Sequence, residues 1–158
     1  YRLAPDLSLT HLLSNITVSN GIAFSQNENI MYFADTPTGL IRKFEFTHNF
    51  KKLQELESNM TFNDVGEPDG ATVDINNNYW SARVRGKCII CINTKNGKII
   101  EKIDLPTNTP TCVTFGDPDL SSLYVTSLRA DPVNDAAGGN LHKIKTETKG
   151  FKQLLTDI

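Results

Sequence analysis

Short runs of apolar residues, separated by polar turns, follow one another along the whole chain. Val, Ile, Phe, Tyr and Thr are concentrated in runs such as Gly21–Phe24, Ile30–Ala34 and Leu123–Thr126, and Asn, Gly, Asp and Pro stand between them. This pattern is typical of β-strands bounded by turns. No window longer than about ten residues keeps the 3.6-residue period of an amphipathic helix. We therefore expect an all-β fold.

The expected strands recur in the same order three times. Each unit opens with a strand, continues through a polar turn into a second strand, and then gives a third; the opening strands are Ser19–Phe24, Pro68–Val73 and Pro110–Phe115. A fourth, outer strand of each unit is expected at Lys52–Leu56, Lys98–Ile103 and Phe151–Leu155. The chain is thus an array of four-stranded units.

The spacing of the units indicates a β-propeller. The equivalent residues Asn20, Asp69 and Thr111 are 49 and then 42 residues apart, and a period of about 40–50 residues with four strands per unit is typical of propeller blades. A β-sandwich also has many short strands, but it predicts no repeat in register. We expect blades at roughly residues 18–60, 68–105 and 109–155.

Three blades do not close a ring, because propellers have about 4–8. We therefore expect residues 1–158 to form one partial propeller domain. Both ends of the array are expected to expose apolar sheet. The missing half of the propeller, or a second copy of this chain, would cover them.

Composition narrows the possible partners and the compartment. The formal net charge of −2 favours neither nucleic acid nor a membrane surface as a partner, and no apolar run approaches the roughly 20 residues of a membrane helix. Cys88 and Cys91 lie in one expected strand, where residues three apart point to opposite faces, so they cannot share a metal ion. We expect them and Cys112 to be free thiols that pack as small hydrophobes, which fits the reducing cytoplasm.

Two equivalent polar residues are candidates for metal binding. Asn20 and Asp69 each stand at the start of the innermost strand of a unit, so adjacent blades would direct both oxygens toward the propeller axis. Amide and carboxylate oxygens suit a hard divalent cation, whereas Thr111 is a poor ligand. Asn-Gly and Asp-Gly are also common turn dipeptides, so a turn role alone is the alternative. Two ligands are too few, so at least one more must come from outside this chain.

Other polar and aromatic residues fit structural roles. Arg83 and Arg85 could face an anionic or hydroxylated ligand, but a solvated strand end is the favoured interpretation. We assign Trp80 to the core between blades and Asp35 to a turn. Residues Ala130–Asn140 form a long insertion that would lie over one mouth of the channel.

Six blocks, in order, resemble the regucalcin (senescence marker protein)/gluconolactonase family. The resemblance runs from Tyr1 to about Leu155 and corresponds to the C-terminal half of that family's six-bladed propeller. The blocks are Ser19–Ser25, Met31–Thr38, Gly66–Gly70, Asn78–Ala82, Pro110–Gly116 and Leu123–Ser127.

The resemblance implies a lactone hydrolase with one divalent metal ion on the propeller axis. The family's metal ligands are a Glu near the domain start, which has no counterpart here, an Asn that matches Asn20, and an Asp that matches Asp69. The metal would be calcium or zinc, with manganese and magnesium as further options. It would polarise the lactone carbonyl of a sugar lactone, and Asp69 would be both ligand and general base. We expect a fragment of such an enzyme, inactive by itself; the alternative is a non-catalytic calcium-binding or regulatory propeller, or an interaction scaffold.

Overall fold

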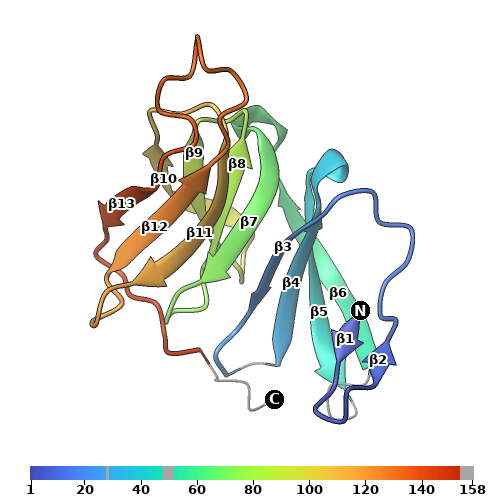
Figure 1. The fold of residues 1–158 in the computed structure, drawn as a ribbon. Helices are drawn as coiled ribbons and strands as arrows, with labels where there is room; N and C mark the ends of the chain where they lie inside the picture. The colour runs from blue at the N-terminus through green and yellow to red at the C-terminus, as the bar shows by residue number, and fades with distance from the viewer. Residues whose placement is uncertain (28, 48–51, 154–158) are drawn as a thin grey trace.

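The computed structural model describes residues 1–27, 29–47 and 52–153, and nearly all regular structure in them is β-strand. A two-stranded piece, β1 (Arg2–Leu3) and β2 (Leu9–Thr10), comes first. Three larger sheets then follow one another along the chain, side by side (Figure 1). The expected all-β fold of successive blades is confirmed.

The first blade is a four-stranded antiparallel sheet in which each strand pairs with the next one in sequence. A single 3₁₀ turn, η1 (Thr36–Thr38), joins its second strand to its third. Its strands are β3 (Ser19–Phe24), β4 (Ile30–Asp35), β5 (Leu40–Thr47) and β6 (Lys52–Thr61).

The second blade has the same order and is preceded by a 3₁₀ turn, η2 (Asn63–Val65). Its strands are β7 (Glu67–Val73), β8 (Tyr79–Val84), β9 (Cys88–Asn93) and β10 (Lys98–Asp104). The first strand of each blade contacts the first strand of the next, because β3 packs against β7 and β7 against β11 (Pro110–Gly116).

The third blade has three strands within the described residues, since β11 is followed by β12 (Ser122–Ser127) and β13 (His142–Lys145). The expected outer strand at Phe151–Leu155 is not found in its described part, because Phe151–Gln153 has no regular structure, and positions 154–155 lie outside the described residues.

A contact with the earlier blades explains this difference. The carbonyl of Lys149 accepts a hydrogen bond of 2.9 Å from the backbone N–H of Ile75 in the second blade. Phe151 then packs against the hydrophobic core between the first two blades. The segment therefore crosses the array instead of pairing with β13.

Hydrophobic cores lie between the blades. Tyr32 of the first blade and Tyr79 of the second belong to one cluster, and Trp80 joins Val113 and Leu123 in the cluster between the second and third blades. The assignment of Trp80 to an inter-blade core is confirmed.

Two of the three cysteines, Cys88 and Cys91, lie as the alternation of side chains along a strand predicts. Cys88 lies in the cluster between the first and second blades and Cys91 in the cluster between the second and third, so they point to opposite faces of β9 as predicted. All three thiols are free. The expectation that Cys112 packs as a small hydrophobe is wrong, because Cys112 is exposed, although it lies beside Gly70 of the second blade.

The two ends of the array differ. On the free face of the first blade Met31, Phe33 and Phe44 form an apolar cluster, and Leu13 and Ile16 of the N-terminal segment pack on it. This end is apolar as expected, but the cluster is buried and not exposed, because the N-terminal segment covers it.

The free face of the third blade is polar, which corrects that expectation. Leu123 and Val125 face the second blade, so Tyr124 and Thr126 point the other way. The register places Lys143 opposite Tyr124, on the same free face. Alternation along β12 thus gives the third blade one apolar and one polar face.

Candidate metal centre

Asn20 and Asp69 lie at the beginnings of neighbouring strands. Asn20 is on β3 and Asp69 on β7, and these strands pack against each other. Both strands, and β11 with Thr111, begin at the same end of the blades, which is the upper end in Figure 1. We call this the ligand end. Both dipeptides, Asn20-Gly21 and Asp69-Gly70, lie within strands and form no hairpin turn.

A register irregularity marks the same place in each blade. The pairing of first and second strands shifts between Asn20 and Ala23, between Pro68 and Ala71, and between Pro110 and Cys112. Such bulges bend a strand and redirect its side chains. The repetition of the bulge supports the equivalence of the three units that the sequence spacing predicted.

The Thr36 hydroxyl joins the two candidate residues' strands. The Asn20 Nδ2 donates a hydrogen bond of 2.8 Å to the Thr36 Oγ1, and this hydroxyl donates one of 2.8 Å to the carbonyl of Pro68, the residue before Asp69. Sequence reasoning missed Thr36. Its only signal was its place in a block that resembles the family, because the hydrogen bonds join residues 16 and 32 positions apart in the sequence.

Asp35 fixes the approach of the chain to β3. Its buried carboxylate accepts the backbone N–H groups of Thr17 and Val18 at 3.0 and 2.7 Å. These hydrogen bonds hold the pKa of Asp35 below its ordinary value. Asp35 also accepts the Thr38 hydroxyl at its carbonyl, so its structural role extends beyond the turn assigned from sequence.

The Asp69 carboxyl is partly buried. Burial raises its pKa above the ordinary value, and a hydrogen bond from the Gly70 backbone N–H opposes this shift. Among the residues that the structure describes, no Lys or Arg forms an ion pair with Asp69. The carboxylate is therefore left without a countercharge from this part of the chain.

The donor set fits a hard divalent cation but is incomplete. The Asn20 amide uses its nitrogen toward Thr36, which leaves its Oδ1 for a ligand, and Asp69 adds a carboxylate. No group of three or more His, Cys, Asp or Glu side chains suited to a metal ion is found in the described residues. The convergence of Asn20 and Asp69 on one ion stays a prediction.

The Arg83 side chain is not solvated, so the favoured interpretation of a solvated strand end is wrong for this residue. It is fully buried and donates hydrogen bonds to the carbonyls of Phe62, Val65 and Gly66. Burial lowers its pKa below the ordinary value. Arg83 thus anchors the loop that leads into β7. The exposed Arg85 agrees with the prediction and pairs with Glu67.

A hollow and a loop shape the ligand end. The hollow, of about 450 Å³, lies beside the η1 and η2 turns and is lined in part by Thr36, Glu67 and Arg85. The expected insertion at Ala130–Asn140 follows β12 at this end, because Ser127 pairs with Pro110 at the start of β11. Its buried Asp135 accepts hydrogen bonds of 2.9 and 2.8 Å from the Thr107 hydroxyl and the Asn108 backbone N–H.

No helix in the described residues is both long and apolar enough to cross a membrane.

Comparison with known proteins gives a family. Residues 1–129 match the model of the SMP-30/gluconolactonase/LRE-like region. The pentonolactonase XacC of Haloferax volcanii is 30% identical over 168 aligned positions, which cover 100% of this chain and 57% of that protein. The 6-deoxy-6-sulfogluconolactonase of Pseudomonas putida is 34% identical, with 75% of this chain and 40% of that protein covered.

A solved structure supports the fold. The crystal structure of a calcium-binding protein, regucalcin, from Agrobacterium tumefaciens matches with a TM-score of 0.82 at 24% identity, covering 96% of this chain and 54% of that one. The β-propeller fold is thereby confirmed. The chain spans about half the length of the relatives it matches. It belongs to the SMP-30/gluconolactonase/LRE-like family.

Proposed function

We propose that this chain is part of a divalent-metal-dependent sugar-lactone hydrolase in which Asn20 and Asp69 bind one ion on the propeller axis. The observation that carries the proposal is their equivalence at the same bulge of adjacent first strands, with Thr36 hydrogen-bonded to Asn20 and to the residue before Asp69. Relatives named as lactonases support the substrate class.

The roles of the two side chains follow from their chemistry. Asn20 is a neutral ligand, so it adds coordination without reducing the charge that acts on the substrate. The bound cation, calcium or zinc with manganese and magnesium as alternatives, supplies Lewis-acid polarisation of the lactone carbonyl. Asp69 takes the proton of the attacking water.

The reaction consumes one water for each ring opened. The water oxygen bonds to the carbonyl carbon, and Asp69 holds the proton that the water loses. The ring C–O bond then breaks, and Asp69 returns the proton to the departing alkoxide. The product is the open-chain hydroxy acid, and the carboxylate of Asp69 is regenerated.

The remaining ligands come from outside the chain. Two oxygen ligands are fewer than the six to eight or so that calcium takes in proteins, and the chain spans about half the length of its relatives. By itself the chain is inactive or nearly so, and the completing half of the propeller restores the site. The three free thiols favour the cytoplasm as its compartment.

Hydrolysis of a panel of sugar lactones, with each of the four metals, tests this function in the completed propeller. Asp69→Asn should remove nearly all turnover without lowering the unfolding midpoint. Asp64→Asn is the matched control, because Asp64 is an exposed carboxylate at the same end, and it should keep full turnover. Substantial turnover by Asp69→Asn at saturating metal would rule out the general base.

The same experiment distinguishes lactone hydrolysis from a second candidate function, metal binding without catalysis. The all-oxygen pair of Asn20 and Asp69 also suits a calcium-binding propeller without catalysis. Saturable cation binding that depends on Asp69, with no hydrolysis of any lactone by the completed propeller, would favour that role. Absence of both would leave an interaction scaffold.

A further inference from the structure

We propose that Thr36 is a positioning residue that sets the orientation of the Asn20 amide and ties it to the strand that carries Asp69. The inference rests on the proposed metal site. It adds a residue that acts on the ligands without touching the ion.

The direction of the hydrogen bonds follows from a count of protons. A hydroxyl has one hydrogen, and a backbone carbonyl can only accept. Because the Thr36 hydroxyl gives its hydrogen to the Pro68 carbonyl, it can only accept from Asn20. The amide must therefore present its nitrogen to Thr36. An amide free to flip would present its oxygen to the ion site only part of the time before the ion binds.

Thr36 is itself held in place by the backbone. Its N–H donates to the carbonyl of Val18 at 3.1 Å, and its carbonyl accepts the N–H of Gly39 at 3.1 Å. Its partner Pro68 is buried, so that carbonyl has no ready replacement from water. The hydroxyl is thus a fixed point between the first and second blades.

Comparison of equivalent positions in the repeats shows that the Thr36 hydroxyl occurs only at the junction between the first and second blades. Asp35 pairs with Ser19 in the first blade, and Arg83 pairs with Pro68 in the second. The residue after Arg83, which corresponds to Thr36, is Val84 and has no hydroxyl. The junction between the first and second blades, which carry Asn20 and Asp69, therefore has the Thr36 hydroxyl. The junction between the second and third blades has Val84, an apolar side chain of the same shape.

Three variants of the chain, each measured in the completed propeller, separate positioning from packing. Thr36→Val keeps the shape and removes the hydroxyl, and Thr36→Ser keeps the hydroxyl. Thr38→Val is the matched control, because Thr38 lies in the same 3₁₀ turn and its hydroxyl bonds the Asp35 carbonyl instead. Mn²⁺ affinity is measured by titration calorimetry, with the unfolding midpoint recorded for each variant.

Thr36→Val should weaken Mn²⁺ binding about tenfold, the lower bound for the loss of an outer partner of a metal ligand. Thr36→Ser should restore the affinity, and Thr38→Val should leave it unchanged. Unchanged affinity in Thr36→Val, or equal weakening in Thr36→Ser, would overturn the inference. If affinity falls in Asp69→Asn but not in Thr36→Val, only this inference fails; if it falls in neither, the proposed metal site fails with it.

A measurement on the unmodified chain covers the case in which Thr36→Val does not fold. The side-chain amide protons of Asn20, observed by NMR without metal, should exchange slowly with solvent because one of them is bonded to Thr36. Exchange as fast as that of an exposed asparagine such as Asn59 would contradict the assignment.

Discussion

The hydroxyl of Tyr79 donates a hydrogen bond of 2.7 Å to the carbonyl of Gly21. A fully buried side chain of the second blade thereby fixes the backbone of the first, directly beside Asn20. Burial raises the pKa of Tyr79 well above its ordinary value, so the hydroxyl keeps its proton. Gly21 has a φ of 60°, and a Cβ there would lie 2.4 Å from the hydroxyl oxygen. The close approach requires glycine.

Tyr79→Phe should lower the free energy of unfolding by about 1–3 kcal/mol, because it leaves the buried Gly21 carbonyl without a partner. Urea unfolding of the two chains measures the difference. Tyr1→Phe serves as the control, because Tyr1 is 81% exposed and should cost little. An unchanged midpoint for Tyr79→Phe would mean that the hydrogen bond contributes nothing.

One thiol should react in the folded chain. Cys112 is exposed, whereas Cys88 and Cys91 are buried and their pKa values are raised by burial. A disulfide reagent should therefore modify one thiol per chain before unfolding and all three afterwards. Cys112→Ser should remove the fast reaction. Fast modification of a second thiol would contradict the placement of Cys88 and Cys91 in the two inter-blade clusters.

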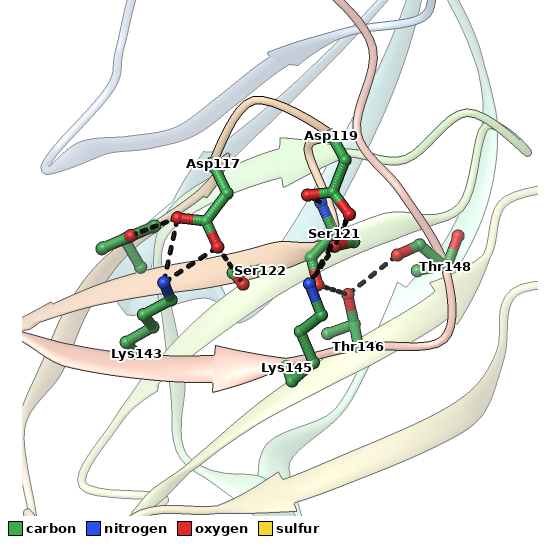
Figure 2. A network of polar contacts seen from close by, with 9 residues as sticks. Asp117, Asp119, Ser121, Ser122, Lys143, Lys145, Thr146 and Thr148 are labelled. Atoms are coloured by element: carbon green, nitrogen blue, oxygen red, sulfur yellow. Dashed lines mark hydrogen bonds and ion pairs between the residues drawn. The ribbon is translucent and has the colours of Figure 1, made fainter.

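Acid should remove stability that Asp117 supplies. Figure 2 shows its carboxylate joined to both Ser122 and Lys143. It accepts hydrogen bonds of 2.6 Å from the Ser122 hydroxyl and 3.0 Å from the Lys143 Nζ. The Tyr124 hydroxyl donates a third hydrogen bond at 2.6 Å. The Ser122, Tyr124 and Lys143 hydrogen bonds, in that order of effect, hold the pKa of Asp117 well below its ordinary value.

A depressed carboxyl pKa stabilises the fold above the unfolded-state pKa, near 3.9, and this contribution disappears as the pH falls through the folded value. Asp117→Asn should therefore be less stable than the native chain at about pH 7, and the difference should shrink below about pH 4. Asparagine tolerates the positive φ of 69° at this position, so the comparison isolates the charge. A difference that does not change with pH would refute the assignment.

The free faces predict which surface associates. Ile22 and Phe24 are 56% and 44% exposed at the apolar end of the array. Thr126 is exposed and points away from the second blade, because its neighbour Val125 faces that blade. Sedimentation should show association that Phe24→Lys weakens and Thr126→Lys does not. A ring of two copies would bring the apolar face against the polar one, so we do not expect it to close. Equal weakening by both substitutions would indicate such a ring.

The sequence predicted what depends on period, and it missed what depends on contacts between distant segments. The equivalence of Asn20 and Asp69 follows from the repeat, and the opposite faces of Cys88 and Cys91 from alternation. The burial of Arg83 depends on carbonyls of a loop some twenty residues earlier, which no local pattern reveals. The hydrogen bonds of the Thr36 hydroxyl to Asn20 and Pro68 also join distant residues, so no local pattern reveals them.

Of two further differences, one had a partial signal in the sequence. Alternation of apolar and polar residues through Leu123-Tyr124-Val125-Thr126 already indicates one polar face on the third blade. The repeat alone predicts an apolar face at both ends of the array. The course of Phe151 had none, because an apolar run reads the same whether it pairs with β13 or packs across the array.

Paramagnetic broadening by Mn²⁺ tests most directly whether Asn20 and Asp69 share one ion. In the NMR spectrum of the chain within the completed propeller, substoichiometric Mn²⁺ should broaden the backbone amides of Asn20 and Asp69 together, at the same concentration, and Asp69→Asn should abolish both effects. Broadening of one amide without the other, or broadening in both that persists in Asp69→Asn, would contradict a shared site.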